Sequence, residues 1–156
     1  MVTKQFQCTL KTDVILNVKS ASEGPNSTLD FIPGNCFLGI AASEYSLFGE
    51  SAWEVFHSGK VRFGDAHPAI NGARSLRVAA SLFHPKLDDS HFFNFHLFER
   101  TAGQIKQCRT DFFDYRGVPP QKLSIDRNFF IKSAYDRNLR RAKDEQMFGY
   151  ESMSRG

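Results

Sequence analysis

The segment at residues 20–34 has the residue types that bind an anionic chain. It is rich in hydroxyl, amide and glycine residues, and a predicted helix begins directly after it. Polar side chains and free backbone N–H groups donate hydrogen bonds to phosphate, and the positive end of a helix dipole favours negative charge. The segment carries neither the Walker A pattern nor GxGxxG, and an ordinary strand-to-helix loop has a similar composition. We call residues 20–34 the elbow and treat them as a candidate phosphate-binding loop.

A second candidate region is the C-terminal third, where basic side chains gather. Residues 101–156 carry 11 basic and 7 acidic side chains, a net charge of +4, whereas residues 1–100 have a net charge of −1. Lysine and arginine attract phosphates without reading sequence, and aromatic rings stack on unpaired bases. A solvated basic face and a tyrosine packed in a core are the alternatives. The residues expected to contact a polyanion are Lys19, Ser20, Ser22, Gly24, Asn26, Gly34, Asn35, Arg137, Arg140, Arg141, Lys143 and Tyr150.

Histidine and cysteine give no comparable pattern. The five histidines contain no HExxH pair, so no metal-ligating residues are predicted. The three cysteines (Cys8, Cys36 and Cys108) are scattered and form no CxxC. This spacing disfavours a zinc ribbon and a disulfide scaffold, and it favours a reducing, cytoplasmic location.

Composition and length set the frame for these candidates. The chain has 156 residues, of which 41% are apolar and 24% charged, with a mean hydropathy of −0.38. Those values predict one folded domain and disfavour disorder. The sequence has no run of about 18 uninterrupted apolar residues, so we expect no membrane association.

The periodicity predicts an α+β protein with more strand than helix. Apolar residues alternate with polar ones over residues 6–18, which predicts a strand that bends near Thr12. Residues 35–48 have helical spacing and end at Gly49. A short helix is expected at 52–58, and strands or ribbons at 61–63, 75–83, 91–98 and 123–134.

A sheet with one amphipathic helix has a poorly covered face. The apolar cluster at residues 147–150 is typical of the start of another strand. We therefore expect a partner chain or further polypeptide to complete the core.

Several short segments, in order, resemble the RAMP superfamily, the proteins that form the backbone of CRISPR effector complexes. The elbow ends in Thr28-Leu-Asp-Phe-Ile-Pro-Gly34, which is most similar to the type III-D backbone subunits. Val61-Arg-Phe-Gly-Asp-Ala-His-Pro68 and Arg74-Ser-Leu-Arg-Val78 fit the same group. So do Ala134-Tyr-Asp-Arg-Asn138 and Met147-Phe-Gly-Tyr-Glu151.

The resemblance implies a fold and a set of partners. It implies one RRM-like (ferredoxin-like) antiparallel sheet domain over residues 1–156, with one main helix and a β-ribbon insertion around 84–122. The C-terminal strands of longer relatives are expected to be lacking, as in a fragment or split subunit. The implied partners are a guide CRISPR RNA, a target RNA and the other subunits of a type III effector complex in antiviral defence. On this basis the elbow lies against the guide backbone.

The resemblance also raises a catalytic possibility, because some backbone subunits of this family cut target RNA. They use an acidic side chain and a divalent metal, which makes Asp30 and Glu23 the candidates and Mg²⁺ the implied cofactor. The family's acid lies farther upstream in the loop, and Asp30 is equally suited to orienting the loop. A structural RNA-binding subunit is the leading hypothesis. The alternatives are a metal-dependent endoribonuclease and a β-rich protein-interaction domain built on the Phe-rich ribbon at 92–98.

Overall fold

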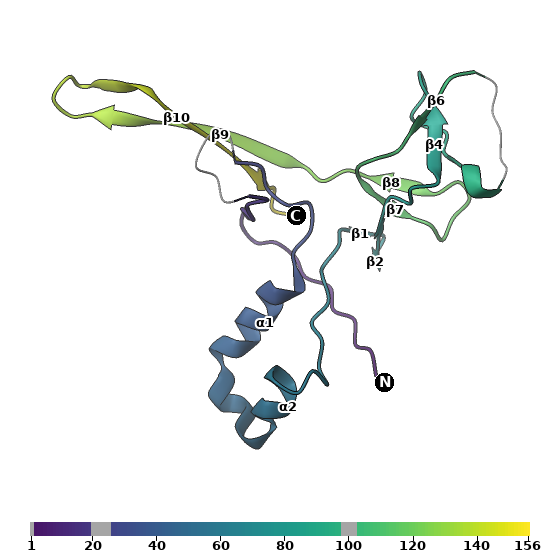
Figure 1. Cartoon of the computed structure of the whole chain (residues 1–156), viewed down its shortest axis with the longest axis horizontal. Coiled ribbons are helices and arrows are strands. Elements are labelled where there is room, and N and C mark those ends of the chain that lie inside the picture. The colour runs from purple at the N-terminus through teal and green to yellow at the C-terminus, as the bar shows by residue number, and fades with distance from the viewer. Residues whose placement is uncertain (1, 20–25, 98–102) are drawn as a thin grey trace.

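The computed structural model describes residues 2–19, 26–97 and 103–156. Three arms diverge from the centre of the molecule: a helical arm, a long two-stranded hairpin and a group of small antiparallel sheets (Figure 1). The predicted α+β class with antiparallel sheets is confirmed. None of the described helices is both long and apolar enough to cross a membrane.

The helical arm contains α1 (Gly34–Ser43), η1 (Tyr45–Ser51) and α2 (Ala52–Phe56). The start of the main helix and the short helix after it are confirmed. The main helix ends earlier than predicted, at Ser43. The 3-10 segment η1 follows it, and the helical conformation of η1 is interrupted at Gly49, where φ is +50°. Rings of Tyr45 and Phe48 lie 5.1 and 5.0 Å from the ring of Phe56, which closes α2 back onto the arm.

The small sheets occupy much of residues 69–123. One sheet pairs β1 (Ala69–Ile70) with β2 (Ala73–Arg74). A second has the order β3 (Leu76–Arg77), β7 (Phe112–Asp114), β8 (Gln121–Leu123), and a third the order β5 (Phe93–Asn94), β4 (Leu82–Pro85), β6 (Ile105–Gln107).

The core of these sheets is aromatic. Phe112 and Phe113 are each 1% exposed, and Phe92 packs edge-on against Phe113 at 5.1 Å. Phe95, which lies in η2 (Phe95–Leu97), is half exposed. The Phe-rich ribbon therefore belongs to this core at one end and faces solvent at the other.

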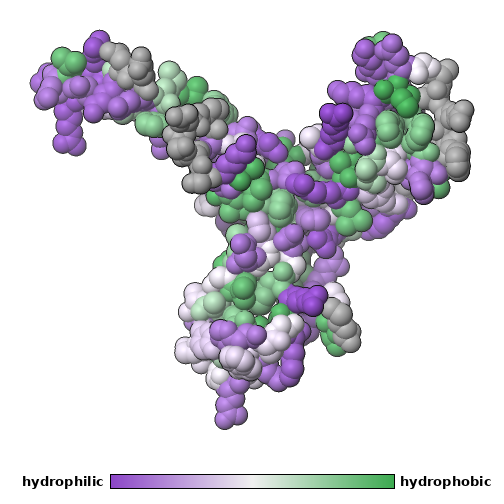
Figure 2. Space-filling model, viewed as in Figure 1, coloured by the Kyte–Doolittle hydropathy of each residue, from purple (hydrophilic) through white to green (hydrophobic). Residues whose placement is uncertain are grey.

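The hairpin joins β9 (Arg127–Asp136) to β10 (Arg141–Met153). Its antiparallel register runs from Arg127↔Met153 at the base of the hairpin to Asp136↔Arg141 at the turn. The register shifts between Ala142 and Met147. The Asp136 carboxylate accepts hydrogen bonds from the amides of Asn138 and Leu139 at 2.9 and 3.0 Å, which shapes the turn. The outer end of the hairpin is mostly hydrophilic (Figure 2).

Several predicted strands differ from the structure. Residues 6–18 do not form a continuous strand; they make isolated bridges only, at Val14↔Met153 and Asn17↔Thr28. Residues 61–63 lie in irregular chain, and the strand expected at 75–83 is divided into β3 and β4. Alternation predicts which side chains share a face, but a strand forms only where another strand supplies hydrogen bonds. The described strands lie in four sheets of two or three strands each.

Candidate nucleic-acid interface

The described end of the elbow lies against the base of the hairpin. The Asn26 amide donates to the carbonyl of Gly149 at 2.8 Å, and the Glu151 amide donates to the carbonyl of Asn26 at 2.9 Å. The Thr28 amide donates to the Glu151 carboxylate at 3.4 Å. Two segments that carry the family resemblance, one near each end of the chain, therefore meet here. The predicted contacts Ser20, Ser22 and Gly24 and the predicted acid Glu23 lie outside the described residues.

Hydrogen bonds tie the elbow to the residues that precede it. The Leu16 amide donates to the Thr28 hydroxyl at 2.9 Å, and the Leu29 amide donates to the Leu16 carbonyl at 2.7 Å. Thr28 is only 3% exposed, so its hydroxyl holds the elbow closed rather than facing a ligand. Lys19, which directly precedes the elbow, is exposed.

One face of the hairpin base combines aromatic rings with a cation. Tyr150 stacks on Phe130, its cross-strand partner, at 5.2 Å and 21°. The Lys132 ammonium lies 5.3 Å from the centre of the Tyr150 ring, and Phe148, opposite Lys132, is 58% exposed. Rings beside a positive charge are the usual platform for unpaired bases.

Of this group, only Tyr150 is predicted from the sequence as a contact. Phe130, Lys132 and Phe148 were missed, although their alternation within the predicted strands was a signal for a shared face. What the sequence did not supply was the register that brings Phe130 and Lys132 opposite β10.

The basic residues lie at the other end of the hairpin. Arg137 and Arg140 are in the turn, and Arg141 and Lys143 follow on β10. All four are exposed. Figure 1 shows this turn at the outer end of the arm, away from the elbow. The structure thus separates two groups of candidate contacts. We call them the junction (Asn26, Phe130, Lys132, Phe148 and Tyr150, of which Asn26 and Tyr150 were predicted) and the basic tip (Arg137, Arg140, Arg141 and Lys143).

The first turn of α1 differs from a free phosphate site. The Gly34 amide donates to the Asp65 carboxylate at 2.7 Å, so a carboxylate already occupies the positive end of this helix. Gly34 is buried, and a Cβ atom there would lie 2.1 Å from the Phe63 carbonyl oxygen. Gly34 therefore serves close packing. Asn35, the next predicted contact, is exposed on the same turn.

Asp30 is held in an ion pair. Its carboxylate lies 2.5 Å from the Arg77 guanidinium, which also lies over the rings of Phe31 and Phe112 at 5.2 and 5.9 Å. Arg77 belongs to β3, so Asp30 fastens the elbow to the small sheets. These contacts favour the loop-orienting role of Asp30.

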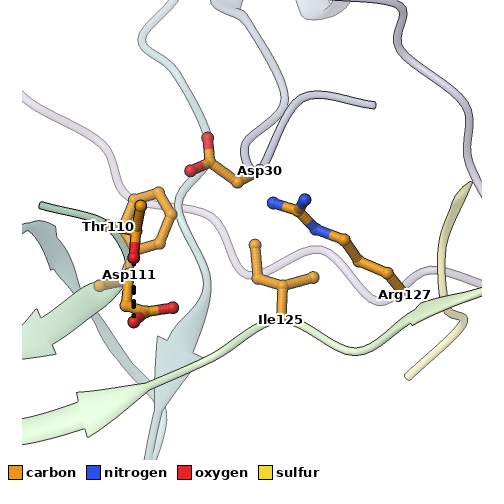
Figure 3. Close-up of a pocket in the computed structure, with 6 residues that line it drawn as sticks. Asp30, Thr110, Asp111, Ile125 and Arg127 are labelled. Carbon is orange, nitrogen blue, oxygen red and sulfur yellow. Dashed lines mark hydrogen bonds between the residues drawn. The ribbon is translucent and has the colours of Figure 1, made fainter. Parts of the chain in front are cut away.

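Asp30 also lines a cavity of about 250 Å³ where the arms meet (Figure 3). Asp111, on its other side, pairs with Lys122 at 3.2 Å and accepts a hydrogen bond from Ser124 at 3.3 Å. Arg127 reaches into the cavity and lies 3.6 Å from the Glu151 carboxylate. The remaining lining residues are Thr110, Phe112 and Ile125.

Each charged residue that lines this cavity is paired with a residue outside the lining: Asp30 with Arg77, Asp111 with Lys122 and Arg127 with Glu151. Across the described part of the chain, no group of three or more His, Cys, Asp or Glu side chains is placed to hold a metal ion. These ion pairs hold the elbow against the small sheets and fasten the two strands of the hairpin base to each other.

Asp13 clamps the segment before the elbow to the hairpin. Its carboxylate accepts hydrogen bonds from the Asn128 side chain at 2.8 Å, the Ser152 hydroxyl at 3.4 Å and the Arg155 amide at 3.0 Å. These bonds lower the pKa of Asp13 below 3.8, with Asn128 the largest cause. Because the folded-state pKa is lowered, this stabilisation is present above pH 3.8 and is lost as pH falls through the lowered value.

We expect Asn128→Ala to raise the pKa of Asp13 toward 3.8, because it removes the strongest of these hydrogen bonds. Ser152→Ala is expected to raise the same pKa by a smaller amount. Titration of the Asp13 carboxyl carbon by NMR measures both shifts. Equal shifts in the two variants, or none, would show that Asn128 is not the main source of the effect.

No family model matches the chain, and no curated protein matches it.

Proposed function

We propose that this protein is an RNA-binding backbone subunit of the RAMP type, built on an incomplete RRM-like fold. In this proposal it holds the guide RNA of a type III CRISPR effector complex in the cytoplasm, beside like subunits and the target RNA. The basic tip contacts phosphates, and the junction stacks against bases. Catalysis is not part of the proposal, since the ion pair of Asp30 with Arg77 suits a positioning role.

The observation that carries the proposal is the pairing of Asn26 with Tyr150. This bridge joins the elbow to the Met147–Glu151 segment, so two motifs that resemble one family lie on one surface. That surface also has the chemistry of a single-strand site, because Lys132 lies over an aromatic stack and Phe148 is exposed beside it.

Purification at low salt without nuclease treatment tests the proposal. We expect short RNA to copurify, because phosphate contacts are strongest at low ionic strength. Ultraviolet crosslinking followed by mass spectrometry is expected to locate the RNA on peptides that contain Tyr150 or the elbow. The part of the helical arm from Cys36 to Phe56 serves as the internal control, since it lies outside the elbow and carries no basic side chain. Absence of nucleic acid, or crosslinks confined to the helical arm, would refute the proposal.

A further inference from the structure

The cavity where the arms meet brings a carboxylate and a guanidinium together without pairing them. Asp30 enters it from the elbow and Arg127 from the start of β9, and Figure 3 shows the Arg127 guanidinium directed toward Asp30. The ion pairs of these two side chains lead away from each other, to Arg77 and to Glu151. The space between them is therefore open to a ligand.

Both side chains keep hydrogen-bonding capacity that the described chain does not use. The ion pair of Asp30 is made through Oδ1, and no described residue donates a hydrogen bond to its Oδ2 atom. Arg127 lies 3.6 Å from the Glu151 carboxylate, which is too long for a hydrogen bond, so the planar donor fork of its guanidinium has no acceptor among the described residues. The third charged residue, Asp111, is already bound by Lys122 at 3.2 Å.

The size and charge of the cavity favour a small neutral ligand with polar edges. Its volume of about 250 Å³ is below the roughly 300–1,000 Å³ of pockets for drug-sized molecules. Each charged lining residue has a partner of opposite charge outside the lining, so the site offers no net charge to a free ion. Phe112 and Ile125 add apolar wall between the polar groups. A single nucleobase has this combination of small size, neutrality and polar edges.

Guanine is the nucleobase whose edges match the two unused groups. Its O6 and N7 atoms accept two hydrogen bonds from an arginine fork, which is the commonest specific contact to a base. Its N1–H and N2 amino groups donate side by side, in the spacing that the two oxygens of a carboxylate accept. Adenine, cytosine and uracil lack that pair of adjacent donors.

We propose that this cavity binds a guanine base, with Arg127 donating to O6 and N7 and Asp30 accepting from N1–H and the N2 amino group. The base can belong to single-stranded RNA or to a free guanine nucleotide, because both present the same edges. The inference goes beyond the phosphate and stacking contacts proposed above, which read no sequence. RNA binding without a preference for guanine would leave the proposed function standing and refute this inference alone.

Isothermal titration calorimetry of the full chain with nucleoside monophosphates tests the two edges separately. We expect GMP to bind at least about tenfold more tightly than IMP, which lacks the N2 amino group, and than 7-deaza-GMP, which lacks the N7 acceptor. AMP is the control for contacts to the ribose and the phosphate. Equal binding of all four nucleotides would overturn the inference for a free nucleotide.

The variant Arg127→Lys tests the arginine directly. Lysine keeps the positive charge beside Glu151 but has no planar fork to bind O6 and N7 together. We therefore expect this variant to bind GMP and 7-deaza-GMP equally. Arg155→Lys is the matched control, because Arg155 is exposed and lies outside the cavity, and it is expected to keep the difference. A difference that persists in Arg127→Lys would overturn the assignment of Arg127.

Short RNA identifies the source of the base. An oligonucleotide with one guanine among uridines is compared with oligouridine of the same length by fluorescence anisotropy. Tighter binding of the guanine-containing strand, lost in Arg127→Lys, would support the inference with RNA as the source. Preference for GMP without any preference between the strands would support it with a free nucleotide as the source. Absence of a guanine preference in both formats would overturn it.

Discussion

Replacing Arg137, Arg140 and Lys143 together with glutamine is expected to weaken binding of single-stranded RNA about a hundredfold at 0.1 M salt. All three side chains are exposed at the basic tip. Each phosphate contact on a single strand contributes roughly 0.7 to the slope of log affinity against log salt concentration. Three lost contacts therefore lower the slope by about 2 and the affinity at 0.1 M salt by about two log units. Fluorescence anisotropy over a range of salt concentrations measures both quantities.

The matched control removes three charges from elsewhere on the chain. Arg62, Lys86 and Lys106 are exposed and lie outside the hairpin, so their replacement by glutamine changes the net charge equally. We expect this control to change the slope little. An unchanged slope in the basic-tip variant would exclude these side chains as phosphate contacts. Equal losses in both variants would attribute the effect to net charge alone.

Gly34→Ala is expected to destabilise the protein by about 3 kcal/mol, the upper end of the usual cost of overpacking. Its Cβ would lie 2.1 Å from the carbonyl oxygen of Phe63, which is backbone and has little room to move. The start of α1 would have to shift, and the hydrogen bond from the Gly34 amide to Asp65 would weaken. Urea denaturation followed by circular dichroism measures the change in the free energy of unfolding.

Gly39→Ala is the control within the same helix. Nothing lies within 4 Å of a Cβ at that position, and alanine favours a helix by about 1 kcal/mol over glycine. We therefore expect this variant to be slightly more stable than the parent. Unchanged stability in Gly34→Ala together with lost RNA binding would contradict the packing role and restore the phosphate-contact role predicted from the sequence.

Gly34 shows the difference between what local sequence predicts and what distant contacts decide. The elbow and the start of the helix were predicted from residues that are close together in the sequence, and α1 does begin at Gly34. The packing role of Gly34 was not predictable, because Phe63 and Asp65 approach it from a distant segment. Asp65 lies 31 positions farther along the chain. A glycine that admits a phosphate and a glycine that admits a neighbouring carbonyl have the same local sequence.

The long hairpin shows the same division. Apolar residues at 123–134 and 147–150 predicted strands, but the predicted boundaries missed the turn between Asp136 and Arg141. The pairing of those strands makes the stack of Tyr150 on Phe130 and puts the basic tip far from the elbow. Alternation specified which side chains share a face, whereas the register specified which of them touch.

The amino-acid sequence alone determined the α+β class, the helix that follows the elbow and the alternation of the N-terminal segment, because these depend on neighbouring residues. Only the tertiary structure decided that Thr28 bonds to Glu151, 123 positions away, and that Asn26 lies beside Tyr150. It also decided that residues 2–12 have no strand beside them among the described residues. The physical reason is that backbone pairing between distant segments depends on which strands compete for the same edge, and local periodicity carries no information about that competition.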